Sequence, residues 1–272
     1  MNEIKSPYKF VGTAPIRPDG VPKVTGVAKF GNDYNLPGML HGKILRSPHA
    51  HALIKSIDTS KAEALPGVKA VMTAEDFPDQ NFAYVGAARV QVNFWHITRN
   101  IMAREKAMYD GHAVAAVAAT SAAIANEAIS LIEVDYEVLP HVIDVDEAMA
   151  PDAPLLFDDM ITRGVEPAPT KPSNVARNVS FEIGDIEAGF AEADEIVEHE
   201  FKTKPVHQAY IEPHACLARY DPDGQGELWS ASQGHFVVRN LTAKIVGMKP
   251  VSYTHLRAHE TKTRISGAGL GG

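Results

Sequence analysis

Five prolines divide the chain into two parts. They lie within residues 151–172, a span with few apolar residues after Phe157. Proline has no backbone N–H and a fixed φ angle, so this density excludes a regular helix or strand. We therefore interpret residues 151–172 as a linker. It separates a domain over residues 21–150, which follows a polar lead-in of residues 1–20, from a second domain over residues 173–272.

The first part alternates between strand and helix patterns. The predicted elements are strands over 39–45, 53–57, 68–72, 113–119 and 133–138, and helices over 59–64 and 122–132. The apolar run 113–119 is typical of a strand buried on both faces, and Ser121 is a suitable cap for the helix that follows. Residues 78–100 lack periodicity and are expected to form a loop. The alternation of strands and helices indicates an α/β or α+β domain.

The second part has a similar mixture. The predicted elements are strands over 175–183, 195–204, 216–220 and 227–231, and helices over 186–192 and 235–246. Asp185 is the expected cap of the first helix. The turn sequence at residues 221–224 predicts a hairpin between the last two strands. Cys216 is expected to be a buried strand residue rather than a nucleophile, because no recognisable pattern places a base beside it.

Charge and cysteine content exclude several classes of protein. The net charge is -8 and no basic run is present, which argues against nucleic acid as the main partner. A single cysteine permits no intrachain disulfide and cannot hold an iron–sulfur cluster alone. It is compatible with a reducing cytoplasm. Neither a secretory signal nor an apolar stretch of membrane-spanning length is recognisable.

Two groups of histidines are candidate metal ligands. His207, Glu212 and His214 have suitable donor atoms, but a hydrogen-bonded loop is favoured because no second ligand cluster supports a metal. His49 and His51 lie on the same face of an extended segment. A surface loop after Ser47-Pro48 is preferred there.

The last six residues, Gly267 to Gly272, match the pattern G-x-G-x-x-G. Such a turn lets a phosphate or cofactor approach the backbone N–H groups. A nucleotide-binding unit would also need a preceding strand, a following helix and a later acidic residue. A flexible glycine tail is the simpler interpretation. Gln233 follows the predicted strand 227–231, and its side-chain amide offers a hydrogen-bond donor and an acceptor to a ligand.

Several short motifs, taken together, resemble one family. They are Lys23-Val24-Thr25-Gly26, Arg46-Ser47-Pro48-His49-Ala50-His51-Ala52, Ile57-Asp58-Thr59-Ser60, Pro66-Gly67-Val68, Gly111-His112-Ala113-Val114-Ala115 and Val134-Asp135-Tyr136-Glu137-Val138-Leu139-Pro140. They look like the α/β hammerhead domain of the molybdenum hydroxylases, the xanthine dehydrogenase and aldehyde oxidase family. Glu212-Pro213-His214, Ser232-Gln233 and the glycine tail resemble the start of its molybdopterin-binding domain. The resemblance implies an α+β chain that forms the N-terminal part of the large subunit.

The resemblance also implies an activity. The family's large subunit carries a molybdenum–molybdopterin cofactor and hydroxylates carbon in aldehydes, purines, N-heterocycles or related small-molecule substrates. Electrons leave through iron–sulfur clusters and FAD, which are expected here on partner subunits. The chain is expected to be inactive alone, because the family's catalytic glutamate has no counterpart in it. A non-catalytic assembly scaffold and a nucleotide-binding protein are the alternatives.

The family's cofactor-binding positions map onto a few residues. Gln233 matches a glutamine that hydrogen-bonds the molybdenum centre, and Gly267, Gly269, Leu270 and Gly271 match a glycine-rich loop beside the cofactor. Leu270 stands where the family has a phenylalanine and Ala268 where it has a glycine, and leucine cannot stack as a phenylalanine ring does. No metal ligand is expected from the chain itself.

Residues 251–261 fit the family badly, because an apolar strand is expected there. They look like an adapter-derived artefact of sequence assembly. On that interpretation His255 and His259, which have helical i,i+4 spacing, form no zinc site. The alternative is a genuine exposed loop or helix.

Overall fold

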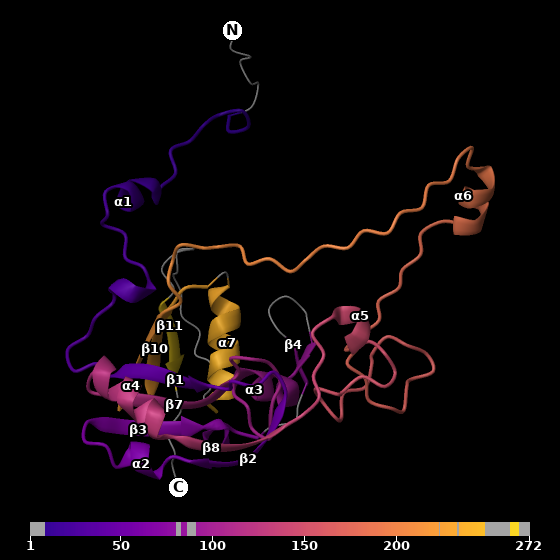
Figure 1. The fold of residues 1–272 in the computed structure, drawn as a ribbon. Helices are drawn as coiled ribbons and strands as arrows, with labels where there is room; N and C mark the ends of the chain where they lie inside the picture. The colour runs from indigo at the N-terminus through magenta and orange to yellow at the C-terminus, as the bar shows by residue number, and fades with distance from the viewer. Residues whose placement is uncertain are drawn as a thin grey trace. The chain divides into compact units, whose positions relative to one another are not determined.

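The computed structural model describes residues 9–79, 83–85, 91–222, 224–232, 234–247 and 262–266. Their contacts form two compact units. The larger unit comprises the described residues of 37–209 and 245–247, and the smaller one those of 1–36, 210–244 and 248–272. Helices and strands are mixed in the chain, as expected for an α+β protein (Figure 1).

An alanine-rich strand is central to the first sheet of the larger unit. This strand, β7 (Ala113–Ala119), pairs antiparallel with β1 (His41–Arg46) on one side and with β3 (Val68–Thr73) on the other. Most of its side chains are buried, which confirms the predicted strand and its burial on both faces. Small side chains allow the neighbouring elements to approach this strand closely.

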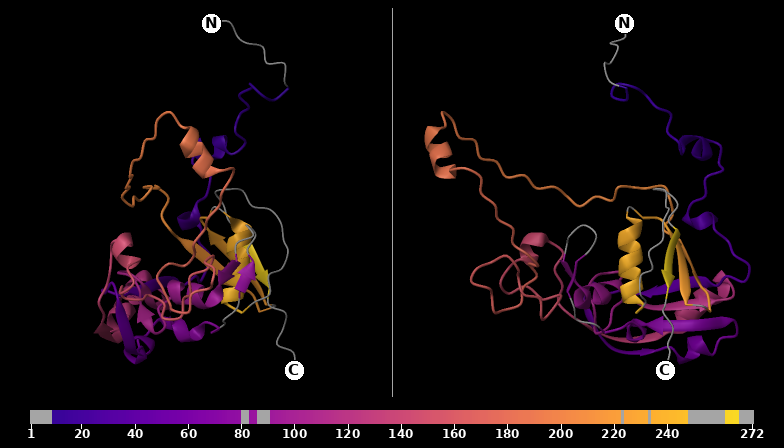
Figure 2. Two further views of the ribbon diagram at one scale, coloured as in Figure 1. Left: turned by 90° about the vertical axis from the view of Figure 1, so that its right-hand side faces the viewer. Right: turned by 180° about the vertical axis from the view of Figure 1, so that it is seen from behind.

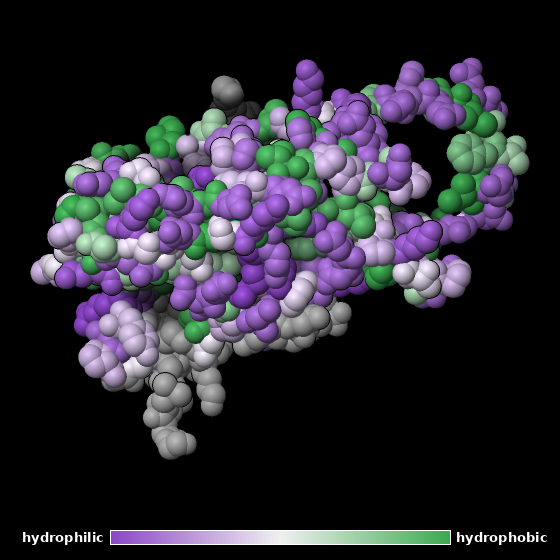
Figure 3. Space-filling view, turned by 60° about the horizontal axis from the view of Figure 1, so that its bottom comes forward, coloured by the Kyte–Doolittle hydropathy of each residue, from purple (hydrophilic) through white to green (hydrophobic). Residues whose placement is uncertain are grey.

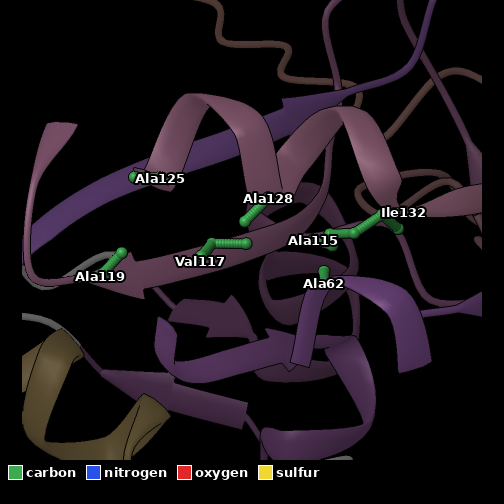
Figure 4. Close-up of a cluster of buried hydrophobic side chains, with 7 residues drawn as sticks. All are labelled: Ala62, Ala115, Val117, Ala119, Ala125, Ala128 and Ile132. Carbon is green, nitrogen blue, oxygen red and sulfur yellow. The ribbon is translucent and has the colours of Figure 1, made fainter. Parts of the chain in front are cut away.

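Helix α4 (Ala122–Leu131) packs against this sheet together with the short helix α2 (Ser60–Glu63). The Ser121 hydroxyl accepts a hydrogen bond from the Ile124 amide at 3.2 Å, which confirms the predicted cap. Alanines form most of the buried cluster between helices and sheet (Figure 4): Ala62, Ala115, Val117, Ala119, Ala125, Ala128 and Ile132.

A second sheet has β2 (Ala52–Asp58) at its centre, flanked by β8 (Glu133–Val138) and by the short β6 (Lys106–Ala107). All of these pairings are antiparallel. Strands β7 and β8 flank α4 in the sequence but belong to different sheets. The strand–helix–strand rhythm therefore produces no parallel pair here, because β8 pairs with β2 instead.

The prediction of a loop over residues 78–100 is wrong for most of the described residues in that range. Strands β4 (Ala83–Val85) and β5 (Gln91–Asn93) pair with each other, and helix α3 (Phe94–Ile101) follows. Phe94 and Thr98, one helical turn apart, are both buried, and the Asn93 side chain caps the helix by accepting from the Trp95 amide at 2.9 Å. Phe94, Trp95, Ile97 and Thr98 are aromatic or β-branched residues with low helix propensity, so the sequence does not favour a helix here.

Two other predicted strands are absent from the described structure. Residues 175–183 and 195–204 form no strand, and an isolated bridge between Arg163 and Arg177 is recorded instead. A strand requires a hydrogen-bonded neighbour, and no described segment provides a ladder for either stretch. Figure 2 shows them as extended chain on either side of α6 (Ile186–Glu192). The predicted cap of that helix is confirmed, since Asp185 accepts from the Ala188 amide at 2.9 Å.

The remaining short helical elements of the larger unit are η2 (Ala74–Asp76) and α5 (Val145–Ala148). The Asp144 carboxylate caps α5 by accepting from the Asp146 amide at 2.8 Å. No described helix has the length and apolar character that crossing a bilayer requires.

The smaller unit contains a three-stranded antiparallel sheet. Strand β10 (Gln225–Ser230) lies between β9 (Cys216–Tyr220) and β11 (Lys262–Ser266). The predicted hairpin is confirmed, and its turn closes with a hydrogen bond from the Gly224 amide to the Asp221 carbonyl at 2.9 Å. Cys216 is exposed rather than buried as expected, because β9 is an edge strand with few covered side chains.

Three helical elements complete this part of the chain. Helix α7 (His235–Ile245) confirms the predicted amphipathic helix, and α1 (Gly20–Val24) and η1 (Gly31–Asp33) precede the larger unit in sequence. Residues of η1 contact β9. Residues 31–33 are therefore associated with the β9–β10 hairpin in the smaller unit.

Candidate functional site

The predicted cofactor-binding residues lie outside the described residues. These are Gln233, Gly267, Gly269, Leu270 and Gly271, and the segment 251–261 lies outside the described residues too. The described residues on either side of Gln233 show which elements precede and follow it in the sequence. Strand β10 ends at Ser230, the Gly234 amide donates to the Ser232 hydroxyl at 3.4 Å, and α7 begins at His235. In sequence, Gln233 therefore falls at a strand-to-helix junction.

Strand β10 is well anchored at the start of this junction. Both of its edges are paired, and Glu227 is 7% exposed. The Trp229 ring packs against Tyr34 with ring centroids 5.9 Å apart. The strand that precedes Ser232 is thus held by the sheet and by the N-terminal segment of the same unit.

Sequence reasoning missed the role of Gly31. A Cβ atom at this position would lie 2.8 Å from the Ala215 carbonyl oxygen, so a larger residue would force the two backbone segments apart. The Gly31 amide also lies 3.5 Å from a carboxylate oxygen of Glu212, in hydrogen-bonding geometry. A single glycine in a polar stretch gives no sequence signal for such a long-range contact.

The three candidate metal ligands His207, Glu212 and His214 have other partners. The His207 ring accepts from the Ala209 amide at 2.9 Å, and Ala209 has a φ of 54°. His214 packs edge-on against Tyr210 with centroids 4.4 Å apart, and Glu212 accepts from Gly31. Within the described ranges, no three His, Cys, Asp or Glu side chains are grouped to hold a metal ion.

The His49–His51 segment is not the surface loop expected. Ser47 and His51 are buried, with 2% and 4% exposure. The His51 ring donates through Nδ1 to the Pro140 carbonyl at 2.6 Å, while His49 packs edge-on against Tyr136 with centroids 5.1 Å apart. The two rings thus have different partners rather than a shared ligand.

A second chain segment fixes this loop. The Ser47 amide donates to the His112 carbonyl at 2.8 Å, and the Gly111 amide donates to the Ser47 carbonyl at 2.9 Å. Burial raises the pKa of Tyr136, and its hydrogen bond with Ser47 partly offsets this. The motifs around residues 46–52 and 111–115 therefore form one interlocked structural element.

His112 is fully buried within this element as a neutral side chain. Its Nδ1 accepts from the Met108 amide at 3.1 Å, which leaves Nε2 to donate to the Asn100 carbonyl at 3.1 Å. Burial lowers the pKa of His112, and the hydrogen bond to the Asn100 carbonyl opposes this shift. Both ring nitrogens form hydrogen bonds with the backbone, so His112 is unavailable for proton transfer.

A cavity of about 310 Å³ in the larger unit has Trp95, Arg99 and Phe157 in its lining. The Arg99 guanidinium lies over the Trp95 ring and forms ion pairs with Asp79 and Glu105 at 3.0 and 2.8 Å. The buried positive charge is therefore neutralised within the unit, and it needs no external anion.

Two family models match the chain in succession. Residues 25–140 match the model for the a/b hammerhead domain of aldehyde oxidase and xanthine dehydrogenase. Residues 168–258 match the model for the molybdopterin cofactor-binding domain. Between them the two models account for most of the chain.

Curated relatives and solved structures agree with these matches. The carbon monoxide dehydrogenase large chain of Afipia carboxidovorans is 40% identical over 229 residues, which are 82% of this chain and 27% of that protein. A probable xanthine dehydrogenase subunit of Bacillus subtilis is 32% identical over 258 residues, 94% of this chain and 30% of that protein.

Among solved structures, the reconstituted CO dehydrogenase from Oligotropha carboxidovorans has a TM-score of 0.68 at 36% identity. Quinoline 2-oxidoreductase from Pseudomonas putida 86 has a TM-score of 0.69 at 30% identity. Each match covers 87% of this chain and less than a third of the other chain.

The chain thus spans roughly a quarter to a third of the length of the relatives described above. The hammerhead match covers the two three-stranded sheets described in the larger unit, and the second match covers the β9–β10 hairpin and α7. The order of the two domains is the one that the sequence motifs predict. The chain therefore belongs to the xanthine dehydrogenase and aldehyde oxidase family of molybdenum hydroxylases, whose members are oxidoreductases.

Proposed function

We propose that the chain contributes the hammerhead domain and the first part of the cofactor-binding domain to a molybdenum-dependent oxidoreductase. The succession of the two family matches, at residues 25–140 and 168–258, is the observation that carries this proposal. The enzyme would hydroxylate carbon in an aldehyde, purine, N-heterocycle or related substrate. The domain limits of 21–150, 151–172 and 173–272 remain part of the proposal.

Several substrate classes are compatible with this region. Relatives at 29–40% identity include a carbon monoxide dehydrogenase, a probable xanthine dehydrogenase and a nicotinate dehydrogenase. Proteins with such different names match 82–97% of this chain. We therefore expect the choice of substrate to depend on residues outside this region.

Gln233 and the glycine run at Gly267, Gly269 and Gly271 are the proposed cofactor-binding residues. The Gln233 amide can donate and accept hydrogen bonds, and glycine backbone lets N–H groups approach an anionic ligand closely. The molybdenum–pterin cofactor, when bound, would supply the redox chemistry, while the protein binds and orients it.

Partner subunits are part of the proposal. Relatives are named as a large chain, a large molybdopterin subunit and a member of a dehydrogenase complex. With one cysteine, this chain cannot hold an iron–sulfur cluster by itself. We therefore assign iron–sulfur clusters and FAD to separate subunits in the cytoplasm. A role limited to assembly of these subunits is the alternative.

A chimeric enzyme tests the proposal. Residues 25–247 would replace the matching region of the Afipia carboxidovorans CO dehydrogenase large chain, expressed with its own partner subunits. We expect the chimera to bind molybdenum, and Gln233→Ala to reduce its activity by about 10- to 100-fold, the usual effect of losing a hydrogen bond close to a metal centre.

Gln208→Ala is the matched control, because Gln208 is an exposed glutamine outside the proposed site. Equal activity of the Gln233 and Gln208 variants would reject the role of Gln233. A folded chimera that binds no molybdenum would reject the proposed function as a whole.

A further inference from the structure

Apolar side chains are exposed along residues 176–206, which we call the α6 segment. Phe181, Ile183, Phe201 and Val206 are 84–89% exposed. Figure 3 shows hydrophobic and hydrophilic residues side by side along it. Single exposed apolar residues are ordinary, but a concentration of them marks a surface that another chain segment covers.

Apolar residues recur at every second position in the first stretch, which therefore has an apolar face, whereas the corresponding face of the second stretch includes a histidine. Val179, Phe181 and Ile183 share one face of the first stretch. In the second stretch, Val197, His199 and Phe201 share a face, and the His199 and Phe201 rings lie 6.0 Å apart. The opposite face, which begins with Ile196, carries Glu198, Glu200 and Lys202. This alternation is typical of a strand with one buried face.

The α6 segment also belongs to a folded domain by its sequence. The match to the molybdopterin cofactor-binding domain begins at residue 168 and runs through the whole segment. A domain buries apolar faces of this kind and pairs its strands. Among the described residues of this chain, none buries the apolar faces of the two stretches, and none forms a ladder of strand hydrogen bonds with them.

We propose that residues 179–183 and 197–201 are strands completed by another strand of the same large subunit. That strand would come from the part of a molybdenum hydroxylase large subunit outside the region that this chain matches, which is about 73% of the CO dehydrogenase large chain, given the 27% that is matched. The faces with Phe181 and Phe201 become buried, and the face with Glu198 and Glu200 stays in water. This inference rests on the proposed function, because it assigns the segment to the cofactor-binding domain.

Charge argues against a second copy of this chain as the occupant. Acidic residues are frequent between positions 178 and 201, and no Lys or Arg occurs among them. The acidic residues are Glu182, Asp185, Glu187, Glu192, Asp194, Glu195, Glu198 and Glu200. Two such segments side by side would place like charges next to each other, which destabilises a strand pair. Neutral or basic strands within the domain avoid this repulsion.

Thiol labelling tests the proposed faces directly. Phe201→Cys and Glu200→Cys would be made in the 272-residue chain and in the CO dehydrogenase chimera. The rate at which maleimide modifies each thiol would be measured by peptide mass spectrometry. Phe181→Cys and Glu182→Cys repeat the comparison on the first stretch. In the chimera we expect Phe201→Cys to react at least about tenfold more slowly than Glu200→Cys, because burial restricts access to the thiol. In the chain alone the two thiols should react at similar rates.

Three results would overturn the inference. They are equal rates for both thiols in the folded chimera, slow labelling of Phe201→Cys in the chain alone, or protection that appears only when a partner subunit is added. A second chimera that carries residues 176–206 alone within the CO dehydrogenase chain repeats the test if the larger exchange does not fold. Molybdenum content is measured separately. A protected segment in a molybdenum-free chimera would reject the proposed function and leave this inference standing.

Discussion

Gly67 shows how a single residue constrains the hammerhead domain. Its φ of +99° lies in the region that favours glycine, and an added Cβ would lie 2.7 Å from Cδ1 of Ile124 and 2.9 Å from the Thr120 hydroxyl. The Gly67 carbonyl also accepts from the Thr120 amide at 2.9 Å. The turn between α2 and β3 is therefore packed directly against the start of α4.

Gly67→Ala is expected to lower the free energy of unfolding by about 1–3 kcal/mol, because strain and a steric clash combine at this position. Urea titrations followed by circular dichroism would measure the change. Gly42→Ala is the control, since nothing lies within 4 Å of its added Cβ. Equal stability of the two variants would contradict the packing described for this turn.

His112 is expected to make stability depend on pH. Its pKa is lowered in the folded chain by burial, so below its ordinary pKa the unfolded chain binds a proton that the folded chain resists. This contribution is present above the ordinary pKa of histidine and is lost as the pH falls. From pH 7 to 5 the unfolding free energy should fall, with at most about 1.4 kcal/mol per pH unit from this one group.

The variant His112→Gln should weaken this dependence, because glutamine does not titrate. Urea titrations at pH 7, 6 and 5 would compare the slopes of the two proteins. If both lose stability equally over this range, another group is responsible.

At the scale of elements, helix α4 depends on its cap. Ser121→Ala removes the acceptor for the Ile124 amide and is expected to cost about 1 kcal/mol of unfolding free energy. Ser130→Ala, on the same helix, removes a hydroxyl that donates to the Glu127 carbonyl on the exposed surface. Thermal unfolding should place the Ser121 variant below the Ser130 variant, and the reverse order would contradict the cap's role.

Local chemistry explains which elements could be predicted from the sequence. The apolar run 113–119 and the caps Ser121 and Asp185 carry their signals within a few residues, and the structure confirms each of them. The stretches 175–183 and 195–204 alternate as strands do, yet they form none, because pairing depends on a distant partner that no local pattern reveals. Helix α3 was missed because its aromatic and β-branched residues have low helix propensity.

Burial at the candidate sites was equally hard to predict. His51 is covered because residues 139–140 pack over it, with the Leu139 amide donating to the His51 carbonyl at 2.9 Å. The sequence places these segments almost ninety positions apart, so a surface loop was the simpler expectation. The roles of Gln233 and the glycine run come from family resemblance and stay predictions.

At the scale of the whole molecule, the two units differ in the sheets and the core that they contain. The larger unit has its own alanine-rich core and, among its described residues, two three-stranded sheets, as expected of a domain that folds by itself. The smaller unit has a three-stranded sheet with the Ser232–Gly234 junction. The α6 segment, which is counted with the larger unit, leaves apolar faces uncovered. The match to the cofactor-binding domain, at residues 168–258, therefore includes residues of both units.

Molybdenum analysis tests this account most directly. The purified 272-residue chain and the CO dehydrogenase chimera would be compared by elemental mass spectrometry after expression in the same host. The account predicts about one molybdenum atom per chain in the chimera and no stoichiometric molybdenum in the 272-residue chain, since binding and orientation of the cofactor need the complete domain. One molybdenum atom per 272-residue chain, or none in a folded chimera, would contradict it.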